Sequence, residues 1–248
     1  MAFGAATPAL RVRRSGDRGF EDFGWTDNWM TFSFGGYHDR DWMRFGPLRV
    51  IVENHIQPHS GFPSHSHRDV EIVTYVVAGC LTHKDSFGHT AGVTAGEMQL
   101  ISAGSNGMIH SEANVHDEVE HNLQIWLVPS KRPTPFVYQQ LKYTPEERQG
   151  QFRLYVSPDG RDGSMPIHTD ASIYAGLFQA GDRTAHTLGR GRGAWVQIVS
   201  GGVDMPGVTL EAGDGVGITG LGQLDFVFRL DTELLLFDLG MDAPLIWQ

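Results

Sequence analysis

Short apolar or alternating runs of four to eight residues recur along the chain, and clusters of Gly, Pro, Asn and Ser separate them. Such runs with such punctuation are typical of β-strands joined by tight turns. In the first half the predicted strands cover 48–53, 70–77, 98–101, 108–112 and 122–128. In the second half they cover 152–156, 173–178, 194–199, 215–218, 225–230 and 233–239. The pattern therefore predicts an all-β protein.

A proline-rich joint divides the two sets of strands. The segment from Pro129 to Gln151 carries three prolines within its first seven residues, and Thr144-Pro145 followed by two glutamates is a typical helix start. We therefore predict an N-terminal domain at 1–130, a linker with short helices at 131–151 and a C-terminal domain at 152–248. Ala95-Gly96-Glu97 is matched by Ala212-Gly213-Asp214, which favours two copies of a jelly-roll barrel.

Composition limits the functions that such a protein can have. The 248 residues carry 19 Lys plus Arg against 29 Asp plus Glu, a formal charge of −10, so binding to a nucleic-acid backbone is a poor expectation. The single cysteine, Cys80, cannot form an internal disulfide, and no stretch approaches the roughly 18 apolar residues of a membrane span. We expect a soluble, cytoplasmic protein that does not act at a membrane.

Two pairs of ligand-type residues stand out among the twelve histidines. His65 and His67 are two residues apart at the edge of a β-type run, and His110 and Glu112 repeat this spacing 43 residues after His67. Because alternate residues of a strand point to the same face, each pair presents two ligands together. If the two segments are neighbours, three imidazoles and one carboxylate converge. Either pair alone is also typical of surface histidines or of histidines hydrogen-bonded at a strand end.

Three neutral nitrogens and one oxygen suit a divalent first-row metal such as iron, copper, nickel, cobalt or manganese, with positions left open for substrate or dioxygen. Structural zinc more often recruits thiolates, and Cys80 lies outside this cluster. The residue types therefore favour an open, redox-capable metal site.

The surroundings of these pairs resemble the two motifs of the cupin superfamily, with Ser102 where proline is usual. The first motif is matched by Gly61, His65, His67, Glu71 and Gly79, and the second by Gly96, His110 and Asn114. Over about residues 10–145 the chain resembles the pirin family more specifically. The segments that carry this resemblance are 45–50, 61–75, His83-Lys84-Asp85-Ser86, Gly96-Glu97-Met98-Gln99, His110-Ser111-Glu112 and 123–127.

The resemblance implies a bicupin whose N-terminal barrel holds one metal, usually iron as Fe(II), bound by His65, His67, His110 and Glu112. Several bacterial pirins are similar to quercetin 2,3-dioxygenases, which open flavonols; this implies a small aromatic substrate, dioxygen as co-substrate and Glu112 as a catalytic proton acceptor. Other pirins are described as redox-responsive regulators that bind a protein partner. Another cupin chemistry, such as isomerisation of a small metabolite, would use the same ligands.

The identity of the carboxylate ligand is a separate question. Glu71 lies four residues after His67, so an unbroken strand would place it on the same face, and many cupins use this glutamate. Pirin-like proteins resemble a pattern that uses Glu112, which we favour, with Glu71 as a group that orients an imidazole if both approach the metal. Ser66, where proline is common, and a loop at 105–109 one residue longer than expected leave the substrate open.

The remaining histidines carry weaker predictions. His83, Lys84 and Asp85 are interpreted as a solvated turn, although they could meet a phenolic substrate. His55 and His121 have no paired spacing and receive no role. His168 and His186 are isolated, so we expect the C-terminal half to bind no comparable metal.

Overall fold

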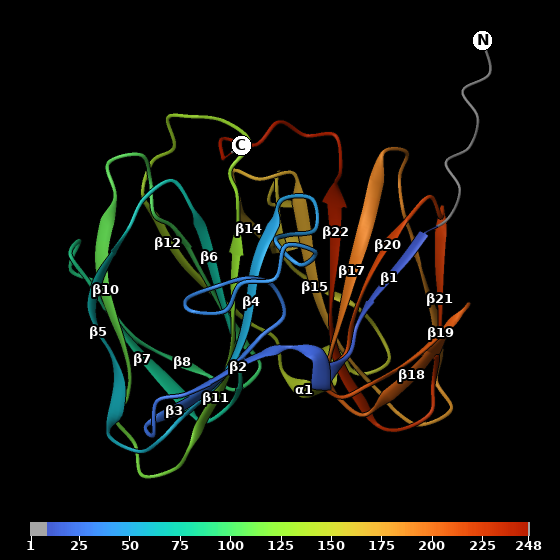
Figure 1. Cartoon of the computed structure of the whole chain (residues 1–248), viewed down its shortest axis with the longest axis horizontal. Helices are drawn as coiled ribbons and strands as arrows, with labels where there is room; N and C mark the ends of the chain where they lie inside the picture. Colours follow the sequence, from blue (N-terminus) through green and yellow to red (C-terminus); the bar gives the residue numbers. More distant parts are fainter. Residues whose placement is uncertain (1–8, 248) are drawn as a thin grey trace.

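Two β-barrels lie side by side in the computed structural model, which describes residues 9–247 (Figure 1). Each barrel consists of one seven-stranded and one four-stranded sheet. This arrangement confirms the all-β, two-barrel prediction. Within residues 9–247, no helix is long and apolar enough to cross a membrane.

The N-terminal barrel has the sheet orders β12-β9-β6-β11-β4-β3-β2 and β5-β10-β7-β8. The strands of its large sheet are β2 (Gly19–Asp22), β3 (Thr26–Met30), β4 (Leu48–Ile56), β6 (Glu71–Ala78), β9 (Glu97–Ser102), β11 (Glu120–Leu127) and β12 (Val137–Lys142). Those of its small sheet are β5 (Ser60–His67), β7 (Cys80–Asp85), β8 (Thr90–Thr94) and β10 (Met108–Asn114).

The C-terminal barrel has the sheet orders β1-β20-β17-β22-β15-β13-β14 and β16-β21-β18-β19. The strands of its large sheet are β1 (Ala9–Arg13), β13 (Arg153–Ser157), β14 (Met165–Pro166), β15 (Ala171–Phe178), β17 (Arg192–Ser200), β20 (Gly215–Thr219) and β22 (Thr232–Gly240). Those of its small sheet are β16 (Arg183–Thr187), β18 (Gly202–Met205), β19 (Val208–Glu211) and β21 (Gln223–Phe228).

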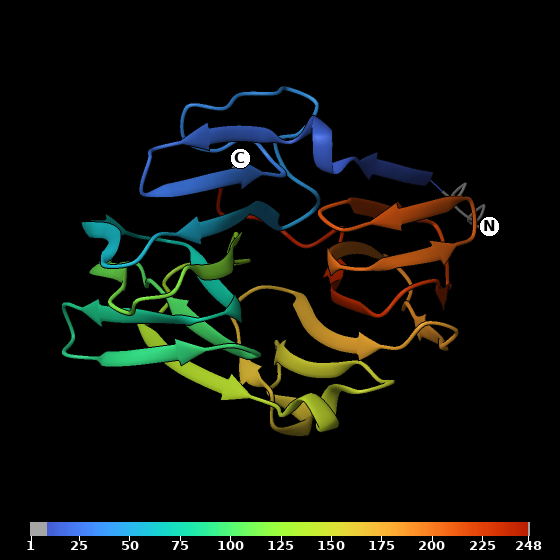
Figure 2. The same ribbon diagram turned by 90° about the horizontal axis from the view of Figure 1, so that it is seen from below.

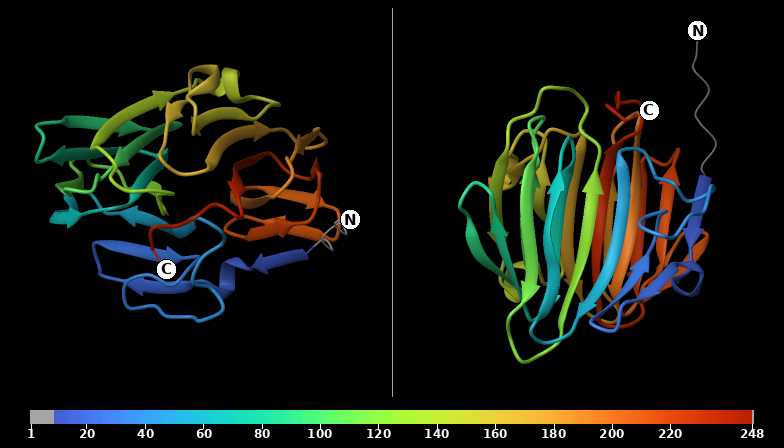
Figure 3. Two further views of the ribbon diagram at one scale, coloured as in Figure 1. Left: turned by 90° about the horizontal axis from the view of Figure 1, so that it is seen from above. Right: turned by 60° about the vertical axis from the view of Figure 1, so that its left-hand side comes forward.

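The two large sheets pack against each other and form the core between the barrels. Leu123 and Ile125 of β11 belong to one buried apolar cluster with Trp195 of β17 and Phe237 of β22. Figure 3 shows these long strands running roughly along one direction in the middle of the molecule. Since alternate residues point to opposite faces, the neighbouring Gln124 faces the inside of the N-terminal barrel, where it bonds to Glu112.

The interiors of the two barrels differ in polarity. The C-terminal barrel is filled by an apolar cluster in which Phe178 stacks on Phe228 at a centroid distance of 4.1 Å. The N-terminal barrel instead buries polar groups, including an Asn54–Asn122 hydrogen bond of 3.1 Å and the carboxyl group of Glu112. Burying a polar group costs free energy unless it finds a hydrogen-bond partner. The polar interior therefore points to the N-terminal barrel as the place of a functional site.

The two ends of the chain are exchanged between the barrels: the N-terminal strand joins the C-terminal barrel, and the C-terminal residues contact the N-terminal barrel. β1, which the sequence places in the N-terminal domain, pairs with β20 and extends the large sheet of the C-terminal barrel (Figure 2). At the other end, Ile246 donates a backbone hydrogen bond to Pro129, and Trp247 packs beside the N-terminal barrel. The division at 1–130, 131–151 and 152–248 stays a prediction, and these two exchanges depart from it.

The expected linker is less helical than predicted. Thr144 caps α1 (Pro145–Arg148) through a capping box with Glu147, as the Thr144-Pro145 pattern predicts. Residues 137–142, however, form the edge strand β12 and pair with β9. The only 3-10 turns among residues 9–247 are η1 (Ser15–Asp17) and η2 (Arg161–Gly163), which lie outside the linker.

Candidate metal centre

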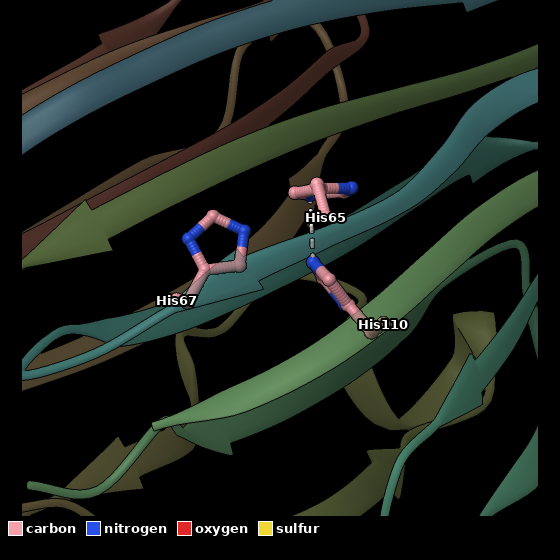
Figure 4. Close-up of side chains that lie close together, drawn as sticks. All are labelled: His65, His67 and His110. Atoms are coloured by element: carbon pink, nitrogen blue, oxygen red, sulfur yellow. Dashed lines mark hydrogen bonds between the residues drawn. The ribbon is translucent and has the colours of Figure 1, made fainter. Parts of the chain in front are cut away.

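Two neighbouring strands of the small sheet position the three candidate histidines. β5 carries His65 and His67, β10 carries His110, and the strands pair antiparallel with His110 opposite His65 and Met108 opposite His67. Figure 4 shows the imidazoles of His65 and His110 facing each other, with His67 beside them. The predicted neighbourhood of the two segments is thus observed.

The imidazoles are close enough to share one ion. One nitrogen from each of His65, His67 and His110 lies within 4.8 Å of the other two, and the Nε2 atoms of His65 and His110 are 2.9 Å apart. The Nδ1 of His65 lies 2.8 Å from the carbonyl oxygen of Pro63. A proton on that Nδ1 donates to the carbonyl and leaves Nε2 as the electron-pair donor, which is how second partners orient metal-binding histidines.

Burial keeps two of these imidazoles in the neutral form that binds metals. Desolvation lowers the pKa of His67 to about 3, with further lowering by the neighbouring His110 and His65. Desolvation also lowers the pKa of His110 to about 3, and His65 and His83 add to this effect. A metal therefore meets little competition from protons at these two nitrogens near neutral pH.

Glu112 lies deep in the barrel beside His110. It accepts a 2.9 Å hydrogen bond from Gln124 through Oε2, while its buried Oε1 has no hydrogen-bond partner among residues 9–247. Burial raises the pKa of the Glu112 carboxyl group. Of the described residues, those grouped with Glu112 are His110 and His83, whose ligand atoms lie within 4.8 Å of one another. The set of three histidines is a separate group that shares only His110 with it.

An irregularity in strand pairing sets the relation between His110 and Glu112. The register shifts from His110 opposite His65 to Glu112 opposite Phe62, so three steps along β5 match two along β10. Pro63, which has no N–H to donate, lies within this bulge. The bulge bends β5 next to the histidines.

Glu71 does not lie with this cluster. The chain leaves the small sheet after His67, turns at Asp69 with a positive φ of 57°, and enters the large sheet at Glu71. There Glu71 hydrogen-bonds to Ser102 and lies 3.1 Å from Nδ1 of His168. The expectation that an unbroken strand carries Glu71 to the face of His67 is therefore wrong. Glu71 does not lie where it could orient an imidazole of the cluster.

His83 and Asp85 are not a solvated turn. Both side chains are fully buried on β7, with His83 Nε2 3.2 Å from Asp85 Oδ2. The His83 ring lies 5.4 Å from that of His110, and Asp85 also accepts from the imidazole of His89. These residues pack directly behind the cluster, because β7 pairs with β10 on the side away from β5.

A pocket of about 600 Å³ reaches one of the three histidines, His67. Its lining includes His67, Arg68, Asn106 and Met108. This volume falls within the range of about 300–1,000 Å³ typical of small-molecule sites. A larger pocket of about 740 Å³ lies away from the histidines, between Arg44 and Trp247.

Sequence reasoning missed Gln124, which holds Glu112. The signal was the alternation in β11, where Glu120, Asn122 and Gln124 are polar while Leu123 and Ile125 are apolar. Such alternation is typical of a strand that has one polar and one apolar face. In β11 the polar face points into the barrel. The Glu71–His168 contact, by contrast, joins residues 97 positions apart and has no local signal.

Comparison with known proteins places this geometry in a family. A family model described as "Pirin" matches residues 11–127, and one described as "Quercetinase C-terminal cupin domain" matches residues 154–239. The chain is 38% identical over 231 residues to the protein named "Quercetin 2,3-dioxygenase" of Escherichia coli K12, covering 93% of this chain and 98% of that protein. The chain belongs to the pirin family.

Further relatives of the pirin family support the same placement. A "Pirin-like protein" of Caulobacter vibrioides is 36% identical over 221 residues, covering 89% of this chain and 95% of that protein. A crystal structure of the bacterial pirin YhhW from Escherichia coli, in complex with nickel(II), superposes with a TM-score of 0.89 at 37% identity and covers 96% of this chain and 100% of that chain. The family assignment confirms the resemblance inferred from the sequence.

Proposed function

We propose that this chain is a metal-dependent dioxygenase that acts on a flavonol, such as quercetin, or on a related phenol. In this proposal His65, His67, His110 and Glu112 bind one divalent metal ion, either Fe(II) or another first-row ion such as nickel. The observation that carries it is the cluster of three imidazoles beside a buried carboxyl group. One of the three, His67, also lines a pocket of about 600 Å³. The name of the Escherichia coli relative, "Quercetin 2,3-dioxygenase", supports the same reaction.

The residues present fit a divalent transition metal. Three imidazole nitrogens lie within 4.8 Å of one another, whereas ligand atoms bound to one such ion at about 2.0–2.2 Å are at most about 4.4 Å apart, so a small contraction suffices. The unpartnered Oε1 of Glu112 is a buried acceptor whose desolvation a cation would offset. Nitrogen and oxygen donors alone do not distinguish iron from nickel or copper.

A divalent metal held by these residues would supply Lewis acidity, which would lower the pKa of a phenolic hydroxyl group of the substrate, and redox chemistry for the reaction with dioxygen. Glu112 would turn away from the ion to take the proton of that hydroxyl group, while Gln124 holds its Oε2 at 2.9 Å. Met108 offers apolar contact to an aromatic ring, and Arg68 and Asn106 offer polar contacts at the pocket rim.

Dioxygen uptake with quercetin tests the proposal directly. The full chain is loaded in turn with iron, nickel and copper, and we expect uptake that depends on both metal and flavonol. Silence with all three metals would contradict the dioxygenase and favour the metal-dependent regulator of a protein partner.

Replacing Glu112 by glutamine separates binding from catalysis. Glu112→Gln keeps the three histidines and the size of the side chain but removes the base, so we expect most of the metal to be retained and turnover to fall about 100-fold or more. Elemental analysis and dioxygen uptake measure the two effects. Glu120→Gln, another buried carboxyl group of the same barrel, is the matched control and should keep its activity. Unchanged turnover in Glu112→Gln would reject the assigned role.

A further inference from the structure

A second group of imidazole and carboxylate side chains lies on the opposite face of the large sheet of the N-terminal barrel. We call Glu53, His55 and His121 the outer cluster. Glu53 and His55 are alternate residues of β4, and His121 of β11 lies directly opposite His55. Their neighbours Asn54 and Asn122 hydrogen-bond to each other inside the barrel, so the outer cluster faces away from the three-histidine centre.

The distances within the outer cluster suit a shared ion. One ligand atom from each of the three residues lies within 4.8 Å of the other two. His121 Nε2 is 2.9 Å from Glu53 Oε1, and the rings of His55 and His121 are 4.2 Å apart between centroids. Ligand atoms bound at about 2.0–2.2 Å can be at most about 4.4 Å apart, so the cluster needs to contract by only a fraction of an ångström.

A second carboxylate orients one of the imidazoles. Asp27 of β3 lies opposite His55 on the other side of β4, and its Oδ1 is 2.7 Å from His55 Nδ1. A proton on Nδ1 then donates to Asp27 and leaves Nε2 of His55 free to bind an ion. This carboxylate–histidine arrangement is the usual support of a metal-binding imidazole.

Arg18 occupies only one of the two carboxylate oxygens of Glu53, so the other is available to a metal. Arg18 donates to Oε2 at 2.6 Å, whereas Oε1 faces His121. Burial alone would raise the pKa of Glu53, but the hydrogen bonds from His121 and Arg18 outweigh burial and lower it to about 2, so this carboxyl group is ionised at neutral pH. The side chains of Glu53, His121 and His55 are 12%, 19% and 33% exposed, which gives an ion access from solvent.

We propose that Glu53, His55 and His121 form a second site for a divalent transition-metal ion such as Zn²⁺, distinct from the three-histidine centre. Two imidazoles and one carboxylate are an established zinc ligand set, with a further position left for water. Binding replaces any proton shared between His121 and Glu53. The ion joins β4 to β11 on the face that packs towards the C-terminal barrel, where Leu123 belongs to the interface core.

Zinc stoichiometry tests the site. The probe is Zn²⁺ alone, titrated into the full chain by calorimetry and counted by elemental analysis after desalting. We expect two ions per wild-type chain, and one in His65→Ala/His110→Ala, where the first centre is removed. Adding His55→Gln and His121→Gln to that background should abolish binding and its zinc-dependent rise in melting temperature.

Control variants keep the test decisive. His59 and Asp117 form an exposed pair at 2.9 Å, so His59→Gln removes a histidine with a carboxylate partner and should leave both ions bound. If His65→Ala/His110→Ala does not fold, His55→Gln/His121→Gln in the otherwise wild-type chain should bind one ion instead of two. A zinc count that is the same in the wild-type chain and after loss of His55 and His121 would show that the outer cluster is only a hydrogen-bonded network and would overturn the proposal.

Discussion

At the residue scale, the inside of the N-terminal barrel depends on how each buried polar side chain is satisfied. Glu120, like Glu112, is only half satisfied. Its Oε2 accepts from Asn122 at 2.7 Å, but its buried Oε1 has no hydrogen-bond partner among residues 9–247. Burial raises the pKa of Glu120 to about 8, and the nearby Glu112 adds to the effect. The carboxyl group is therefore protonated in the folded protein over a range where it is ionised in the unfolded chain.

Glu120→Gln should stabilise the protein at alkaline pH. Because the folded pKa of about 8 exceeds the ordinary value of 4.5, stability falls as pH rises from 4.5 to 8. Glutamine resembles the protonated form and removes this loss. We expect a melting temperature several degrees above wild type at pH 8.5 and close to it at pH 5, measured by calorimetry.

Glu118 provides the comparison for this variant. It is exposed and lies two residues before Glu120, so Glu118→Gln should leave the pH dependence of the melting temperature unchanged. An equal effect of Glu120→Gln at pH 5 and pH 8.5 would show that proton binding by Glu120 is not its cause.

At the element scale, the sequence predicts that the candidate histidines lie together, but it does not predict the strand that carries two of them. The two-residue spacing of His65 and His67 was sufficient to place both imidazoles together. β5 itself, with its sequence Ser-Gly-Phe-Pro-Ser-His-Ser-His, has no β-branched residue and includes a proline, so propensity does not reveal it. Its pairing with β10 supplies what local sequence lacks, and Glu71 was misplaced because the chain changes sheets in between.

Gly61→Ala tests how closely β5 must approach β10. A Cβ at Gly61 would lie 2.4 Å from the carbonyl oxygen of Glu112 and 2.5 Å from Cα of Ala113, both of them backbone atoms that cannot move independently. We expect β5 to shift, with a loss of about 1–3 kcal/mol in the free energy of unfolding and weaker nickel binding. Denaturant titration and calorimetry measure the two effects.

The matched substitution is Gly222→Ala. A Cβ at Gly222 meets no atom of the described residues within 4 Å, and this glycine is not among those with positive φ. It should leave stability and nickel binding close to wild type. Full nickel affinity in Gly61→Ala would mean that the histidine strands tolerate separation.

At the scale of the whole molecule, the sequence predicts two barrels but not how they are tied together. The spacing of the predicted strands and the Pro-rich joint are local properties of the sequence, so they can be recognised without a structure and indicate a duplication. The contacts that join the two halves of the chain involve distant positions: Tyr75 of β6 donates to Glu233 of β22, 158 residues away, and β1 from the start of the chain pairs with β20. Long-range contacts of this kind depend on the finished packing, so single-sequence patterns do not encode them visibly.

His168 makes one of these ties sensitive to pH. It belongs to the C-terminal half and lies 3.1 Å from Oε1 of Glu71 in the N-terminal barrel, whose side chain is 1% exposed. The hydrogen bond from His168 to Glu71 raises the pKa of His168 more than its partial burial lowers it. A raised histidine pKa contributes stability that is present in full below the unfolded value of about 6.5 and disappears as pH rises through the folded value.

His168→Gln should therefore destabilise the protein most in mild acid. At pH 6 the variant lacks the attraction between a charged His168 and Glu71, and the difference in melting temperature should shrink towards pH 9 as the wild-type imidazole loses its proton. Calorimetry at both pH values measures the difference, and His116→Gln, which changes an exposed histidine, should show none. If His168→Gln lowers the melting temperature equally at pH 6 and pH 9, the contact holds the barrels together by packing and neutral hydrogen bonding, and its charge contributes nothing.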